Sequence, residues 1–146
     1  MPENLFSQQN AGHPKNQNST FKTPPQGNLP PIFHKAKGLY LLWYGYYRIL
    51  PTTHRYTLGQ KVDKYFTEII ESVAIATFMS QAEKIPYVQL AIRKADVLKI
   101  FLHILWETKS LDDSKYIQLS EKLNSVGKDL GGWNGSLLKK NSPNKK

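Results

Sequence analysis

The stretch LDDSKYIQLSEKLNSVGKDLGGWNGSL, residues 111–137, carries the pattern that decides the fold. Its large apolar residues recur at alternating intervals of three and four, as in a helix that packs along its length against other helices. These residues are Tyr116, Leu119, Leu123, Val126, Leu130, Trp133 and Leu137. Asp112 and Asp113 precede the pattern, where an N-cap and a first-turn acid are favourable. We therefore predict the last helix of a helical bundle here.

Three glycines, Gly127, Gly131 and Gly132, interrupt this helical pattern. Each glycine inside a helix costs about 1 kcal/mol relative to alanine. We interpret them as positions where a neighbouring helix approaches closely, next to the large ring of Trp133. The alternative is a helix that ends near Leu130 with a glycine C-cap.

Length and composition indicate one domain with a single small core, since the chain has 146 residues. The absence of cysteine excludes disulfides and zinc-thiolate sites. No apolar run is long enough to span a bilayer, and the polar N-terminus lacks the apolar core of a signal peptide. We expect a cytoplasmic protein with a disordered tail over residues 1–29, a bundle over residues 30–138 and a basic tail over residues 139–146.

Three further helices are predicted upstream of residue 111. Pro30-Pro31 starts the first, whose core stripe is Ile32, Ala36, Leu39, Trp43, Tyr47 and Leu50. The segment Arg55–Gln60 enters the second, and Pro86 opens the third. The buried stripe of the third helix is Val88, Ala91, Ala95, Leu98, Leu102 and Leu105. Strand patterns are lacking, so the fold class is an all-α, up-down four-helix bundle.

The third helix carries a second apolar stripe that points away from the first. A contiguous exposed apolar ridge is uncommon on soluble monomers. We therefore predict that these residues form an interface between copies of the chain: Leu90, Val97, Ile100 and Ile104. Burial of the whole helix within the monomer is the competing explanation.

The positive charge is unevenly distributed. The net charge is +9, and residues 31–60 hold four Lys or Arg residues and no acid. Such asymmetry favours a polyanionic partner, although a generally basic protein would show it too. Cations alternate with aromatic residues on one face of the first helix, which suits phosphate contact and base stacking or a simple solvated face. The candidate nucleic-acid-binding residues are Lys35, Lys37, Arg48, Arg55 and Arg93.

No catalytic constellation is present in the sequence. The four histidines are scattered, and no metal-binding or phosphate-loop motif occurs. Aromatic residues near Trp43 could suggest a cofactor site, but aromatics at helical spacing are more often core. We expect neither catalytic residues nor a metal or other cofactor, and hence no enzyme.

Two segments carry a family resemblance. The segment PTTHRYTLG, residues 51–59, enters the second helix, and VGKDLGGW, residues 126–133, lies in the fourth. Together with four helices they resemble the accessory variability determinant (Avd) proteins of diversity-generating retroelements. The match covers about residues 29–138.

The resemblance implies a four-helix bundle that assembles as a homopentameric barrel with a basic surface. It implies two partners, the reverse transcriptase of the element and its template-repeat RNA, and binding of DNA is compatible with it. The protein would be a non-catalytic accessory factor for mutagenic cDNA synthesis. The bundles encoded by intervening sequences of ribosomal RNA genes share this fold and are the alternative, as protein-interaction modules.

Overall fold

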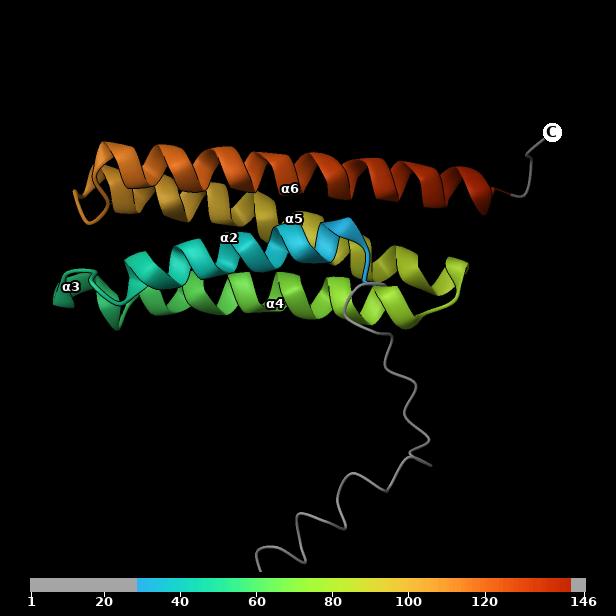
Figure 1. Ribbon diagram of the computed structural model, residues 1–146, viewed down its shortest axis with the longest axis horizontal. Coiled ribbons are helices and arrows are strands. Elements are labelled where there is room, and N and C mark those ends of the chain that lie inside the picture. The colour runs from blue at the N-terminus through green and yellow to red at the C-terminus, as the bar shows by residue number, and fades with distance from the viewer. Residues whose placement is uncertain (1–28, 143–146) are drawn as a thin grey trace, which may run out of the picture.

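The computed structural model describes residues 29–142, and this part of the chain is helical without strands. Figure 1 shows its helices, which are α2 (Pro31–Tyr47), α3 (Thr52–Arg55), α4 (Leu58–Phe78), α5 (Gln81–Glu107) and α6 (Asp113–Lys140). The predicted all-α fold is therefore confirmed. The expected disordered tail over residues 1–29 lies outside the described residues except for Leu29, as do the last four residues of the expected basic tail.

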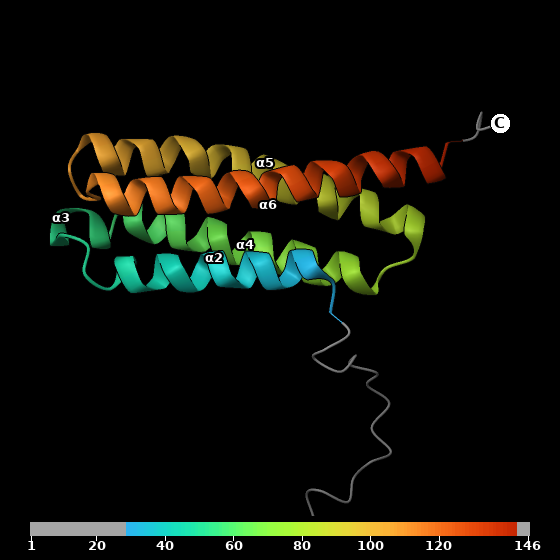
Figure 2. The same cartoon turned by 45° about the horizontal axis from the view of Figure 1, so that its top comes forward.

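The four long helices form an up-down bundle, because each runs opposite to the one before it (Figure 1). α2 packs against α4 and α6, and α5 packs against the same two helices from the other side. α2 and α5 therefore lie diagonally across the bundle, as Figure 2 also shows. The short α3 lies at the same end of the bundle as the α5–α6 turn. The outward-facing side chains of α2 and α5 thus lie on opposite sides of the molecule.

The packing pattern of α6 matches the sequence prediction. Asp112 is the N-cap and accepts a hydrogen bond from the Lys115 backbone N–H at 2.9 Å. The interior of the predicted stripe is buried, whereas Tyr116 and Trp133 near its two ends are half-buried. The buried members are Leu119, Leu123, Val126, Leu130 and Leu137.

Within the single chain, neither interpretation of the α6 glycines holds. The helix does not end near Leu130, since it continues to Lys140, beyond the predicted end of the bundle at residue 138. No neighbouring helix approaches the glycines either: Cβ atoms on Gly131 and Gly132 would meet nothing within 4 Å. At Gly127 the nearest atom is the flexible Lys99 Nζ, 3.9 Å away. The reason is rotational position, because the glycines flank the buried stripe instead of sitting in it.

α5 starts earlier than predicted. It begins at Gln81, so that Pro86 lies inside the helix instead of opening it. Pro86 is the sixth residue of α5, so it lies beyond the first four N–H groups that lack a helical partner and removes one intrahelical hydrogen bond, to the Ala82 carbonyl. The Lys84 ammonium strengthens the junction by donating to the Ala76 carbonyl at 2.6 Å and the Thr77 carbonyl at 3.3 Å. Its partial burial lowers the pKa of Lys84.

Trp43 anchors the core between α2 and α4. Its buried ring stacks on Tyr47 at 5.4 Å and contacts Phe66 at 5.5 Å between ring centroids. The indole N–H donates to Asp63 Oδ1 at 3.1 Å, which satisfies the one polar group of the ring. The pKa of Tyr40 is raised to about 12, mainly because the phenol is partly buried and secondly because it is hydrogen-bonded to Asp63. These aromatics therefore pack as part of the core between α2 and α4.

Among residues 29–142, no helix is both long and apolar enough to cross a bilayer.

Candidate nucleic-acid interface

The outward side of α2 is the basic helix face that the sequence predicted. His34, Leu41 and Arg48 are exposed there, while Lys37 is half-buried toward the edge. α2 and α3 contain no acidic residue, so no carboxylate from these two helices neutralises the cations. A polyanion that approaches this side meets positive charge and open helix surface.

A groove between α2 and α6 adjoins this side. Its volume is about 270 Å³, and its walls are His34, Lys35, Gly38, Leu39, Lys122, Ser125 and Val126. Lys35 is paired with Asp129, with 2.7 Å between Nζ and Oδ2. Lys122 forms no ion pair with any carboxylate of residues 29–142. The groove therefore presents an unneutralised ammonium beside a histidine, which suits a phosphate group.

The structure brings together three of the five predicted cations. Lys37 lies on α2 and Arg48 is the C-cap of this helix, while Lys35 lies on the side of α2 that faces Asp129 of α6. Arg93 is exposed on α5, the helix diagonal to α2, so it is not part of the same surface.

Arg55 lies at the end of this surface but has a structural role as well. Its Nε and a terminal guanidinium N–H both donate to the Leu50 carbonyl, at 3.2 Å and 2.9 Å. These bonds hold α3 against the end of α2 and leave part of the guanidinium free for other contacts.

Two cations on α6 were missed from the sequence. Lys115 and Lys122 are seven residues apart on the side of α6 that faces α2. The Lys115 ammonium lies 5.6 Å from the centroid of the Tyr46 ring on α2, and Lys122 lines the groove. Their spacing places them on one side of α6, but the sequence alone did not say which helix that side meets.

The second apolar stripe of α5 is largely exposed, so the explanation that the monomer buries the whole helix is wrong. Ile100 is 60% exposed, Val97 and Ile104 are also exposed, and Leu90 is half-buried. The opposite stripe of α5 is buried as predicted, from Val88 to Leu105. We call Val97, Ile100 and Ile104 the α5 ridge. Its role as an interface stays a prediction.

Within residues 29–142, no three His, Asp or Glu side chains lie close enough together to hold a metal ion. A His54–Ser110 contact joins α3 to the α5–α6 turn. Neither ring nitrogen of His54 has an acidic partner among the described ion pairs. This contact therefore ties α3 to the α5–α6 turn.

Comparison with known proteins identifies no relative: no protein-family model matches the chain, and neither a curated protein nor a solved structure is significantly similar to it.

Proposed function

We propose that this chain is a non-catalytic accessory protein of a diversity-generating retroelement. In this role it binds the template RNA, or DNA, and the reverse transcriptase of the element, and so supports mutagenic cDNA synthesis in the cytoplasm. The observation that carries the nucleic-acid part is the acid-free α2 with its exposed cations, together with Lys122 across the groove. The reverse transcriptase and the retroelement rest on the resemblance of residues 51–59 and 126–133.

The first of these two segments has a clear structural use, which supports treating it as a motif. Residues 51–59 span α3 and the first residues of α4. Within it, Arg55 ties α3 to Leu50, and Gly59 allows α3 to pack onto α4. The second segment lies in α6, and its residues Val126 and Leu130 belong to the buried stripe of that helix.

The proposed assembly is a homo-oligomer that covers the α5 ridge. An apolar ridge on a soluble protein marks an interaction surface, and a second copy is an economical partner because it is always present. The pentameric ring follows from the resemblance alone. A ring would also gather several copies of the basic α2 surface, which strengthens attachment to one long polyanion.

The alternative function is a protein-interaction bundle of the ribosomal RNA intervening-sequence type. The exposed apolar residues of α5 favour it, since they fit a protein partner as well as a second copy.

An RNA-binding titration at several salt concentrations decides between the two functions. Binding through Z phosphates of a single strand should weaken with a log–log slope of about −0.7Z. We expect measurable binding at low salt with this dependence. A chain that does not bind RNA at low salt, alone or with a reverse transcriptase, would belong to the alternative class.

A further inference from the structure

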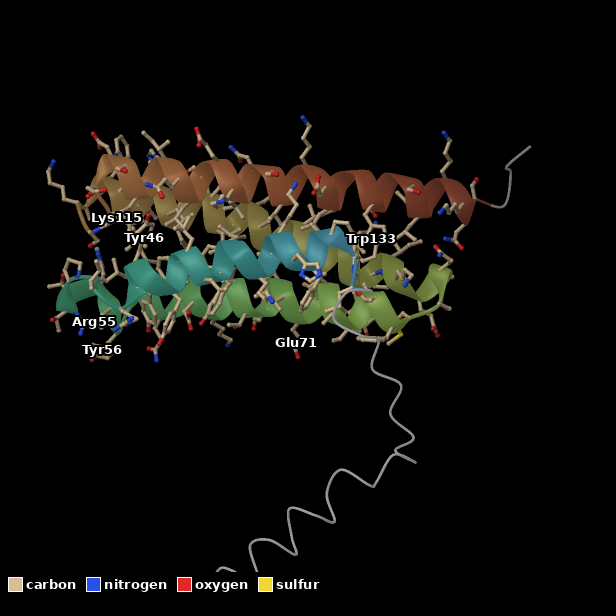
Figure 3. All side chains as sticks on the ribbon, viewed as in Figure 1. Tyr46, Arg55, Tyr56, Glu71, Lys115 and Trp133 are labelled. Carbon is tan, nitrogen blue, oxygen red and sulfur yellow. The ribbon has the colours of Figure 1, made fainter. Side chains whose placement is uncertain are left out.

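Tyrosines paired with cations gather at the α3 end of the bundle. Arg48 Cζ lies 5.8 Å from the centroid of the Tyr44 ring, and Arg55 Cζ lies 5.9 Å from that of Tyr56. The Lys115 ammonium lies near Tyr46 in the same way. Figure 3 shows Tyr46 and Lys115 where α2 and α6 meet, at the same end as Arg55 and Tyr56. We call Tyr44, Tyr46 and Tyr56 the tyrosine platform.

Two rings of the platform are open to solvent. Tyr44 is 47% exposed and Tyr56 is 63% exposed, so neither is needed to fill the core. Tyr46 is half-buried, and its hydroxyl donates to Gln118 Oε1 at 2.9 Å, which fixes its ring between α2 and α6. A fixed ring can receive a flat ligand without first losing conformational freedom.

The α2 surface between these rings is open, and α2 itself contributes no negative charge to it. Gly45 is exposed, and a Cβ atom placed on it would meet nothing within 4 Å. Ile49 is exposed next to it, and α2 and α3 contribute only cations. A flexible chain that carries negative charge could therefore cross α2 from the Tyr46 side to the Tyr44 side.

Aromatic faces interleaved with cations suit single-stranded nucleic acid. Unpaired bases stack on aromatic rings while Lys and Arg contact the phosphates, whereas a duplex keeps its bases stacked inside and offers mainly its backbone. Arginine beside tyrosine also adds cation–π attraction and can stack on a base itself.

We propose that the tyrosine platform binds single-stranded nucleic acid, with bases stacked on Tyr44 and Tyr56 and phosphates contacted by Arg48 and Lys115. This proposal rests on the proposed nucleic-acid function and narrows it to unpaired strands. The contacts are to ring faces and backbone phosphates, so they tolerate any base sequence.

Abasic oligonucleotides separate stacking from phosphate contact, because they keep the phosphates and lack the bases. The full chain is titrated with a short single-stranded RNA or DNA and with an abasic strand of equal length. We expect the chain to bind the base-containing strand about tenfold more tightly or better. In the double variant Tyr44→Ala, Tyr56→Ala, the affinity for the base-containing strand should fall to that for the abasic strand. The affinity for the abasic strand, and the salt dependence of that binding, should stay the same.

Two control variants show whether the loss of preference for base-containing strands is specific to the rings of Tyr44 and Tyr56. Phe78→Ala removes an aromatic side chain that is 57% exposed at the far end of α4, and it should leave the ratio unchanged. Tyr44→Phe, Tyr56→Phe keeps the rings without the hydroxyls and should retain the preference. Circular dichroism confirms that each variant remains helical.

The outcomes distinguish a failure of this stacking proposal from a failure of the proposed nucleic-acid function on which it rests. Equal affinity of the unmodified chain for the two strands, with salt-dependent binding to both, overturns the stacking site and leaves the proposed function in place. Binding to neither strand at low salt overturns both. Loss of the preference in Phe78→Ala as well would overturn the placement of the site at the α3 end.

Discussion

A Cβ atom on Gly59 would lie 2.7 Å from the carbonyl oxygen of His54, closer than side-chain atoms normally approach. The same atom would meet Leu50 Cδ1 at 2.7 Å and Tyr47 at 3.2 Å. The φ angle of Gly59 is not positive, so this glycine is required for space and not for backbone conformation. α3 can pack onto the start of α4 only because residue 59 has no side chain.

Replacing Gly59 with alanine should therefore destabilise the bundle. The obstructing atom at His54 is backbone, which cannot rotate away, and overpacking of this kind costs about 1–3 kcal/mol. Urea denaturation followed by circular dichroism measures the free energy of unfolding. A variant as stable as the unmodified chain would show that α3 moves aside at little cost.

Gly131→Ala is the matched comparison and should have the opposite effect. Gly131 is exposed in the middle of α6, and a Cβ atom there would meet nothing within 4 Å. Alanine should raise the free energy of unfolding by up to about 1 kcal/mol, because it is the better helix former. Destabilisation measured in the same urea experiment would mean that another molecule packs against this face in solution.

Much of the fold follows from spacing alone. The alternation of three and four in α6 predicted its buried side, and the stripe of α5 from Val88 to Leu105 is buried as predicted. Asp112 was predicted to cap α6 and does so. Such patterns are local, since helical geometry fixes which residues share a face.

The errors arise where the outcome depends on what lies opposite a residue. A glycine inside a helix looks the same in sequence whether a neighbour contacts it, as at Gly59, or open solvent does, as at Gly131. Lys122 was missed, and Arg93 was included, because only the packing order of the helices shows which sides meet. Pro86 looked like a helix start, although it is the sixth residue of α5 and costs that helix one hydrogen bond near its N-terminus.

Tyr40 should make the stability sensitive to high pH. Its pKa is raised from 10.0 to about 12 in the fold, so folding favours the neutral phenol. The resulting stabilisation is complete below pH 10 and is lost as the pH rises toward 12. Burial raises the pKa of Tyr47 in the same direction. Tyr40→Phe should therefore lose less stability than the unmodified chain over this range, as measured by thermal melts at each pH.

Charge reversal on α2 should weaken nucleic-acid binding. Lys37→Glu with Arg48→Glu reverses two cations outside the buried stripe, so helicity and melting temperature should stay unchanged. RNA affinity should fall, and the magnitude of the salt slope should decrease by about 0.7 for each phosphate that the variant no longer neutralises. Fluorescence anisotropy at several salt concentrations measures both quantities.

Lys64→Glu with Arg93→Glu is the control, because it changes the net charge equally. Lys64 is exposed on α4 and Arg93 is exposed on α5, away from the α2–α6 groove. This pair should weaken binding less than the α2 pair. Equal weakening by the two pairs would mean that total charge, and not the α2 surface, determines the affinity.

The α5 ridge should determine the oligomeric state. Val97→Glu with Ile104→Lys places charges on the ridge without changing the net charge, and both sites are exposed in the monomer, so the bundle should stay helical. Size exclusion with light scattering should show a multimer for the unmodified chain and a monomer for the variant. Ile117→Glu, at an exposed site on α6, should leave the mass unchanged. A mass near 16.7 kDa for the unmodified chain would contradict the interface and weaken the retroelement proposal with it.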